Sequence, residues 1–361
     1  MITRSEPSEQ LTQHKGSAET RFQILHNFPA AELETLWRQH LDRMDCPAHY
    51  NAPEFFLEPY WEGLHPFAIL AMEQGRVVAV LTGLHNGNEV VCGAPSRPQI
   101  SIDKTADALA ATDILAQGLI SEAGNAKLIT VFSWSWAPLP ALEKRGYRRR
   151  ELEGNVVLDL RPGSEALFDQ FPKNRRRDIR AAIRNGIEVA EEITAEDVAE
   201  YWNVYSAWRK TERKEIHHNR SFAMIDKVRA LRASHRRFLA RYQGKVVAAS
   251  GLRFCQGGLV ELANNCSLDE YLKLLPNDLL VWHTIKWACE QGFTKYSLGG
   301  AHPFLRKWGE TVVPIYRYRL DRTFLHRHDL KDDLAAIARR AFNSLPNEFK
   351  NRTRKLLRKS R

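Results

Sequence analysis

Polar side chains that could bind or activate a substrate gather in the second half of the chain. Asn264 and Asn265 end one apolar stretch, and Asn277 and Asp278 begin the next. Residues 258–265 are expected to form a strand and the following run a helix, and the concentration of polar side chains between these apolar stretches predicts a cleft that could hold a polar substrate. Asn277 also suits the N-cap of that helix and Asp278 its first turn, which is a purely structural alternative.

Residues further along the chain could carry acid–base or electrostatic chemistry. His302 follows Gly299-Gly300, a pair small enough to let a ligand approach closely, although it could equally be an ordinary loop histidine. Lys307 could stabilise an oxyanion or hold a phosphate, or it could be a surface lysine. Tyr316 lies on an alternating stretch, which leaves open whether it faces the core or a cleft.

Positive charge is concentrated in two blocks of this chain, whose formal net charge is +10. Arg177, Arg180 and Arg184 share one helix face, where mutual repulsion favours binding of an anionic substrate or carrier; a solvated face is the alternative. Residues 350–361 form a basic tail that could contact a membrane surface or nucleic acid. No nucleic-acid recognition motif accompanies either block.

The candidate site residues fall into two groups. The candidate catalytic residues are Lys307, His302 and Asn265. The candidate substrate-binding residues are Arg177, Arg180, Asn264, Asn277, Asp278 and Tyr316. The five cysteines lack the spacing of a zinc site or a disulfide framework, so we expect no metal.

The chain repeats one pattern in its two halves. Residues 67–93 and 236–263 both form an apolar run, a Gln-Gly-basic turn, a Val-Val-Ala re-entry and a Gly-Leu pair. A turn of this kind between apolar runs predicts a β-hairpin, and its recurrence indicates duplication of a whole domain. The seam between two such domains is a natural place for a cleft.

The remaining periodicity predicts helices over residues 30–44, 164–185 and 221–232, and a final strand over 312–320 that closes the second sheet. Tyr147–Arg150 and Asn155–Leu160 are expected to be two closing strands of the first sheet.

We therefore expect an α+β fold in four parts. These are a disordered tail over 1–21, a first domain over 22–160, a second domain over 161–330 with the active cleft, and a basic helical tail over 331–361. No apolar run is long enough to cross a membrane. The first residues lack the apolar stretch of a signal peptide, so we expect a cytoplasmic location.

Three segments carry a resemblance to a known family. Residues 141–147 (ALEKRGY) resemble the late helix-to-strand step of the GNAT acyltransferase domain. Residues 177–189 and 296–309 (YSLGGAHPFLRKWG) resemble segments of the Fem-type peptidoglycan bridge-forming aminoacyltransferases. The resemblance covers about residues 22–350 and implies two tandem GNAT-like domains, each with a mixed twisted sheet flanked by helices.

The resemblance implies transfer of an acyl or aminoacyl group to an amine of a cell-envelope or polysaccharide precursor. Acyl-CoA (acetyl-CoA), an acyl carrier protein or aminoacyl-tRNA would be the anionic donor, a co-substrate rather than a tightly bound cofactor, and the acceptor could bear a phosphate. Leu305 stands where the family often has lysine, and both halves lack the glycine-rich pyrophosphate loop. Acyl transfer is the leading hypothesis, and these departures are the best support for the alternative, a non-catalytic binding or assembly protein of the same fold.

Overall fold

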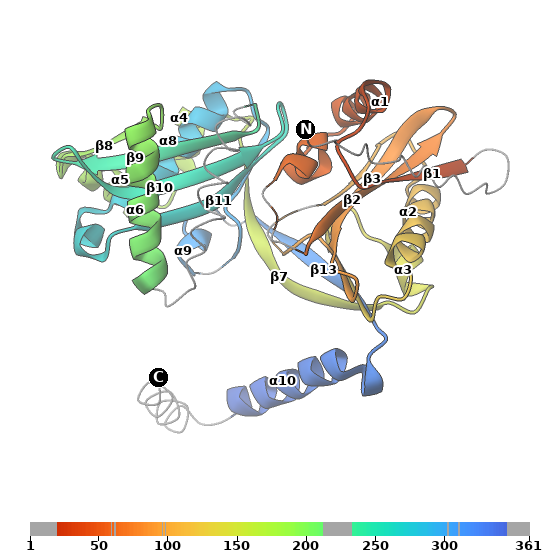
Figure 1. Ribbon diagram of the computed structural model, residues 1–361. Helices are drawn as coiled ribbons and strands as arrows, with labels where there is room; N and C mark the ends of the chain where they lie inside the picture. Colours follow the sequence, from red (N-terminus) through yellow and green to blue (C-terminus); the bar gives the residue numbers. More distant parts are fainter. Residues whose placement is uncertain are drawn as a thin grey trace, which may run out of the picture.

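The computed structural model describes residues 20–58, 60, 63–95, 97, 99–211, 233–301, 303–309 and 311–344 (Figure 1). Its strands are β1 (Thr20–Leu25), β2 (His65–Glu73), β3 (Arg76–His85), β4 (Glu89–Cys92), β5 (Ile100–Ile102), β6 (Leu128–Trp134), β7 (Arg148–Asp159), β8 (Ile187–Glu191), β9 (His235–Tyr242), β10 (Lys245–Phe254), β11 (Leu259–Ser267), β12 (Lys295–Ser297) and β13 (Val312–Asp321).

Its α-helices are α1 (Ala31–Asp42), α2 (Ala108–Ala123), α3 (Pro140–Glu143), α4 (Ser164–Gln170), α5 (Lys173–Arg184), α6 (Ala195–Thr211), α8 (Pro276–Glu290), α9 (Pro303–Arg306) and α10 (Arg327–Ser344). Short 3₁₀ helices are η1 (His49–Asn51), η2 (Pro53–Leu57), η3 (Asp269–Leu274) and η4 (Phe324–His326). The helix expected over 221–232 and most of the tail expected over 1–21 lie outside the described residues.

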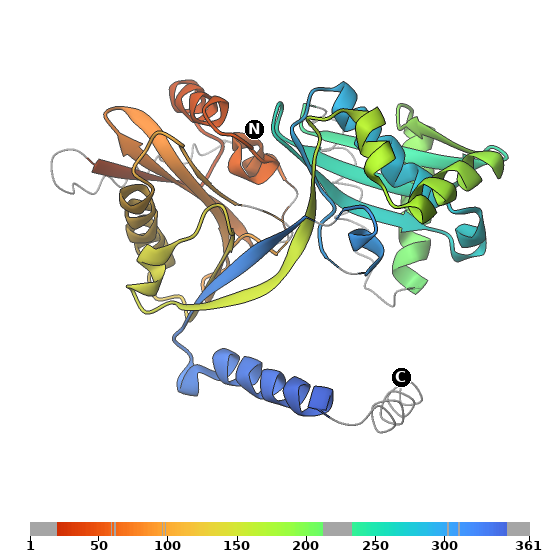
Figure 2. The same cartoon turned by 180° about the vertical axis from the view of Figure 1, so that it is seen from behind.

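The described strands form one continuous mixed sheet with the order β1-β2-β3-β4-β6-β13-β7-β12-β11-β10-β9-β8, and β5 pairs with β3. Each half contains an antiparallel three-strand meander, a long helix, a parallel strand and a short helix, so the α+β plan with a repeated element order is confirmed. In the second half α6 covers one face of the sheet and α4, α5 and α8 cover the other (Figures 1 and 2).

Both faces of the meander strands are buried, because helices cover them on two sides. Ile69 and Leu81 pack in the core beneath α2, whereas Leu70 and Val80 pack with Trp37 of α1. These strands therefore read as continuous apolar runs rather than alternating ones, as in sheets covered on both faces.

Several predicted elements differ from the structure for local reasons. The helix expected over 164–185 is two helices, α4 and α5, because Pro172 cannot continue a helix and Phe171 before it is extended (φ −64°, ψ 143°). The sequence analysis did not predict β1. This strand contains the first residues that the structure describes, and it pairs with β2 in the sheet.

The closing strands are exchanged between the halves, and β7 and β13 run side by side from one half to the other (Figures 1 and 2). β13 lies between β6 and β7 in the sheet of the first half, so the prediction that it closes the second sheet is wrong. The two short strands expected before residue 160 are one long strand, β7, whose last residues pair with β12. A bulge between Val313 and Ile315 bends this pair, and Gly154 is required opposite it because a Cβ there would strike the Val313 carbonyl.

Candidate functional site

The second half contains a wedge where two parallel strands part. β11 and β12 pair only through Leu259–Glu261 and Lys295–Ser297, and β11 then continues to Ser267 beside β10 alone. The β10–β11 register shifts between Gly251 and Leu252, which leaves Ala263 as an extra residue at the point of parting. A bulge of this kind disrupts the ladder and re-aims the backbone, a feature common beside active sites.

The first half does not repeat this wedge. There β4 pairs with β6 along its whole length, from Glu89 to Cys92. The next backbone N–H, that of Gly93, donates a hydrogen bond to the side chain of Gln99. The backbone group that follows the strand is therefore already satisfied within the protein.

The structure separates the two neighbouring asparagines of β11. The Asn264 Oδ1 atom accepts a hydrogen bond from the hydroxyl of Tyr201, 2.8 Å away on α6. Asn265 points to the opposite face, where its Oδ1 accepts from the Ser250 hydroxyl at 3.2 Å. Both side chains are half-buried. Only Asn265 thus lies on the face of the sheet covered by α8.

The N-terminus of α8 lies at the end of β11, and it brings Asn277 beside that strand. Its N-cap is Leu275 in a left-handed conformation (φ 63°), followed by Pro276, so the interpretation of Asn277 as the N-cap is wrong. The Asn277 Nδ2 donates to the Ser267 hydroxyl at 2.9 Å, and its Oδ1 is buried without a partner among the described residues. An acceptor in this position can take a hydrogen bond from a ligand.

Asp278 is committed to a structural contact. Its carboxylate forms an ion pair with Arg175 of α5, and both side chains are buried. The Arg175 guanidinium lies 4.8 Å from the ring centre of Trp308 and 5.3 Å from that of Phe304. The pair therefore joins α5, α8 and the segment around α9 beside the wedge.

The remaining candidate residues that the structure describes are spread more widely. Arg177 bonds to Asp178 and is 71% exposed, and Arg180 is exposed above the ring of Phe168. Lys307 is exposed just after α9, while Leu305 is buried in the core.

Tyr316 lies on β13, in the sheet of the first half and not at the wedge. Its ring centre is 5.0 Å from the Arg149 guanidinium carbon. His302 lies outside the described residues.

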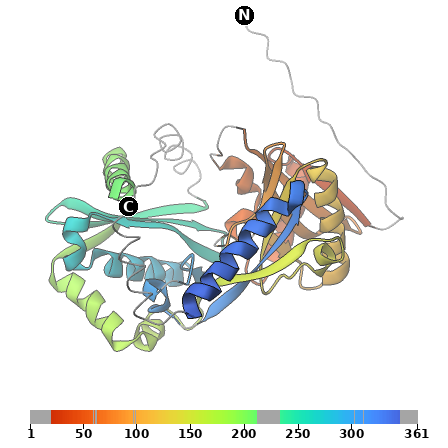
Figure 3. The same ribbon diagram turned by 90° about the horizontal axis from the view of Figure 1, so that it is seen from below.

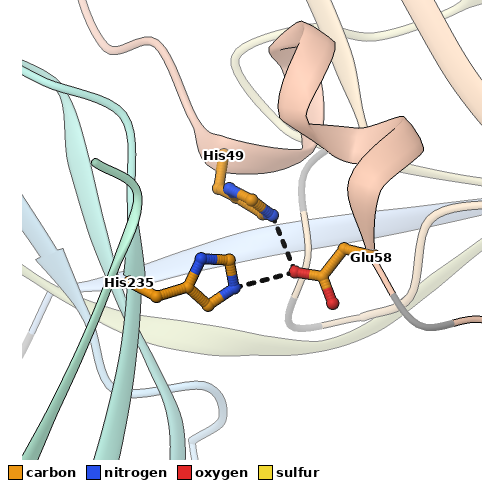
Figure 4. Close-up of side chains that lie close together, drawn as sticks. All are labelled: His49, Glu58 and His235. Carbon is orange, nitrogen blue, oxygen red and sulfur yellow. Dashed lines mark hydrogen bonds and ion pairs between the residues drawn. The ribbon is translucent and has the colours of Figure 1, made fainter. Parts of the chain in front are cut away.

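A buried cluster at the seam was missed by the sequence analysis (Figure 4). The Glu58 Oε1 atom lies 2.8 Å from His49 Nε2, 2.9 Å from His235 Nε2 and 2.9 Å from Arg253 Nε. Burial opposes ionisation of Glu58, yet Arg253 and the two imidazoles hold the pKa of its carboxyl well below the usual value. Glu58 is therefore a carboxylate that accepts from donors of both halves.

The same cluster has the composition of a metal centre, because ligand atoms of His49, Glu58 and His235 all lie within 4.8 Å of one another. Arg253 donates hydrogen bonds to both carboxylate oxygens of Glu58, the one to Oε2 being 3.2 Å long. These bonds use the oxygen lone pairs through which Glu58 would bind a metal. A divalent ion would meet this guanidinium in a buried site, where the repulsion is poorly screened. The residues do not fit a metal, and the cluster instead links the halves.

The sequence offered one weak signal for this cluster: a lone Glu58 directly after the apolar run Phe55–Leu57. A cavity of about 450 Å³ also opens at the seam. It is lined by Arg38, Asp42 and Glu54 of the first half and by Ser234 and Cys255 of the second, among others. It touches the N-terminal end of β11 through Gly257, the end opposite to the wedge.

The sequence profile of the acetyltransferase (GNAT) domain matches residues 173–309, which include the wedge. No curated protein sequence matches the chain. The fold is similar to that of FemX, with a TM-score of 0.62 at 14% identity, covering 80% of this chain and 96% of FemX.

Two further structures are similar across most of the chain. The C-terminal domain of a putative lysylphosphatidylglycerol synthetase from Agrobacterium fabrum gives a TM-score of 0.57 at 14% identity, covering 84% of this chain and 96% of that one. A tandem GNAT protein of the clavulanic acid pathway gives 0.55 at 11% identity, covering 85% and 99%. Residues 173–309 therefore match the acetyltransferase (GNAT) domain, and the chain as a whole is similar in fold to FemX and to a tandem GNAT protein.

Proposed function

We propose that this protein is an N-acyltransferase that transfers an acyl or aminoacyl group to an amine of a cell-envelope or polysaccharide precursor. The observation that carries the proposal is the wedge between β11 and β12, with its bulge at Ala263, inside the segment that matches the GNAT domain. Two proteins of similar fold, FemX and a putative lysylphosphatidylglycerol synthetase, have names that support an acceptor in the cell envelope.

The proposed reaction is a nucleophilic substitution at a carbonyl carbon. The unprotonated acceptor amine attacks the acyl carbon, a C–N bond forms, and the C–S bond of a thioester donor or the C–O bond of an aminoacyl ester breaks. The amine loses a proton, and the leaving thiolate or alkoxide gains one. Backbone N–H groups beside Ala263 would stabilise the oxyanion, since donors fixed before the reaction need no reorganisation.

The described side chains suggest how the donor and acceptor would be held. The N-terminus of α8 carries the positive end of a helix dipole, which suits a donor phosphate. Asn265 and the free Oδ1 of Asn277 would orient the acceptor amine, because that oxygen can accept one of its N–H groups. Lys307 would contact the donor from the exposed segment after α9.

A donor screen tests this proposal. The purified full chain is incubated with acetyl-CoA, longer acyl-CoA thioesters or aminoacyl-tRNA and a panel of amine acceptors, and mass spectrometry detects acylated products. Lys307→Ala is expected to lower turnover by about 10²–10³-fold if the lysine meets the oxyanion or a donor phosphate. The matched control is Lys286→Ala, which removes an exposed lysine on a different helix, α8, and should retain full turnover.

One structural observation supports the non-catalytic alternative. Leu305 stands at the position where the family often has a lysine, and its side chain is buried in the core. A binding protein of this fold would bind a donor or acceptor in calorimetry and yield no product with any pair. Turnover that depends on Lys307 would exclude that reading.

A further inference from the structure

Helix α10 presents its apolar side to solvent, the reverse of an ordinary surface helix. Leu330, Leu334 and Ile337 are spaced i, i+4, i+7 along it and are 50%, 58% and 61% exposed. We call these three residues the outer stripe. An amphipathic helix normally packs such a stripe against the core. No helix among the described residues is long and apolar enough to cross a membrane, and α10 is no exception.

Ion pairs made by acidic residues of α10 hold the helix against β7 and β13. Asp333 accepts two hydrogen bonds from Arg148 of β7, both 2.8 Å long. Asp332 lies 2.6 Å from Arg317 and 2.7 Å from Arg319, both on β13. These pairs hold α10 against the basic outer side of β7 and β13, while the outer stripe stays exposed to solvent.

The start of α10 is also held firmly. Both carboxylate oxygens of Asp321, a buried residue at the end of β13, accept hydrogen bonds: one from Thr323 and the other from the backbone N–H groups of His328 and Asp329. This arrangement satisfies N–H groups of the first turn as an N-cap would. The helix runs along one side of the molecule, below both halves in Figure 1 and across them in Figure 3.

The charges around the outer stripe indicate what it meets. Arg327 and Lys331 are exposed along one border of the stripe, and Phe324, 86% exposed, precedes the helix. Residues 345–361, which follow α10 directly, carry seven Lys or Arg and one Glu. An apolar stripe bordered by cations suits a surface that is apolar inside and anionic outside, which describes an anionic lipid bilayer.

We propose that α10 docks this protein on an anionic lipid surface, with the outer stripe entering the headgroup boundary and the neighbouring cations contacting lipid phosphates. The inference does not depend on the proposed acyl transfer. The lysine and arginine side chains can bury their aliphatic stems beside the stripe while their charges stay with the headgroups.

Vesicle co-sedimentation of the full chain tests the proposal. Vesicles of phosphatidylcholine are compared with vesicles in which about a third of the lipid is phosphatidylglycerol. We expect binding to the anionic vesicles that weakens as salt is raised. The double change Leu334→Gln with Ile337→Gln should lower the partition coefficient by about tenfold or more, because the apolar contact is lost. Ala335→Gln, at an exposed position of α10 outside the stripe, is the matched control and should bind as the parent does.

Three results would overturn the proposal. The first is a parent protein that fails to bind anionic vesicles. The second is equal binding by the parent and the double variant, which would assign the attraction to the tail charge alone. The third is a parent that sediments as a dimer and a double variant that sediments as a monomer, which would show that a second copy of the chain covers the stripe.

Discussion

Replacing Glu58 by glutamine should loosen the contact between the two halves of the chain. Glu58 belongs to the first half and accepts hydrogen bonds from His235 and Arg253 of the second half as well as from His49. Its side chain is buried, and so are both histidines. Glu58→Gln keeps the size of the side chain, but it removes the negative charge and turns one acceptor atom into a donor.

The size of the effect follows from what is left behind. Arg253 would lose its only carboxylate at hydrogen-bond distance among the described residues, and breaking a buried ion pair costs about 3–5 kcal/mol. Glu261, a buried side chain nearby, still attracts Arg253, which places the expected loss near the lower end, about 3 kcal/mol. With an m-value of about 3 kcal/mol per molar urea, the unfolding midpoint should fall by about 1 M.

Urea unfolding followed by tryptophan fluorescence measures this loss. The control is Glu54→Gln, which removes another carboxylate of the same segment, one paired with the half-exposed Arg38. A pair of that kind contributes about 1 kcal/mol or less. Combining Glu58→Gln with Arg253→Met should restore part of the stability, because the uncompensated charge is then gone. Equal small losses for Glu58→Gln and Glu54→Gln would refute the interpretation of the cluster as a contact that holds the halves together.

Three further outcomes are expected. Asp278→Asn should lower the free energy of unfolding by about 3 kcal/mol in urea titrations, because it leaves a buried arginine without its partner; unchanged stability would return Asp278 to substrate binding. Neutralising Arg177 and Arg180 together should raise the apparent substrate constant and flatten its salt dependence in kinetic assays, whereas a solvated face predicts no change in either. Burial lowers the pKa of His40 and of His235 to about 4. In the unfolded chain these histidines bind protons near pH 6.5, whereas in the folded protein they stay neutral down to about pH 4. The free energy of unfolding, measured as a function of pH, should therefore fall by several kcal/mol between pH 6.5 and about 4 and stay level above pH 7.

The sequence predicts the meanders and long helices well because their apolar runs and turns are local signals. The helix α2, for example, begins after Asp107, whose side chain accepts from two backbone N–H groups, and ends before Gly124. The break at Pro172 was readable in principle, since proline disfavours both its own and the preceding helical position.

The exchanged strands and the site geometry depend on long-range pairing, which local patterns do not encode. Nothing in the sequence of β13 specifies β6 as its partner, because strand pairing depends on contacts between residues far apart in the chain. For the same reason, the sequence does not predict which way the polar side chains point. Asn264 and Asn265 are neighbours in sequence, yet the pleat sends them to opposite faces of the sheet. The cluster of Glu58 and its partners joins residues far apart in the chain, so no spacing predicts it.

The two halves share an element order but not a role in forming the wedge. In the first half the group after β4 is satisfied by Gln99, whereas in the second half β11 continues beyond its partner and leaves the wedge. The first half also fixes the start of β11: the Leu259 N–H donates to the Pro47 carbonyl at 2.8 Å, and Gly258 has no room for a Cβ against Pro47. If the wedge is the site of the proposed acyl transfer, it needs a rigid base to hold the reacting groups in place. The exchanged strands, the Glu58 cluster and this backbone contact all join the two halves, and together they would supply that base.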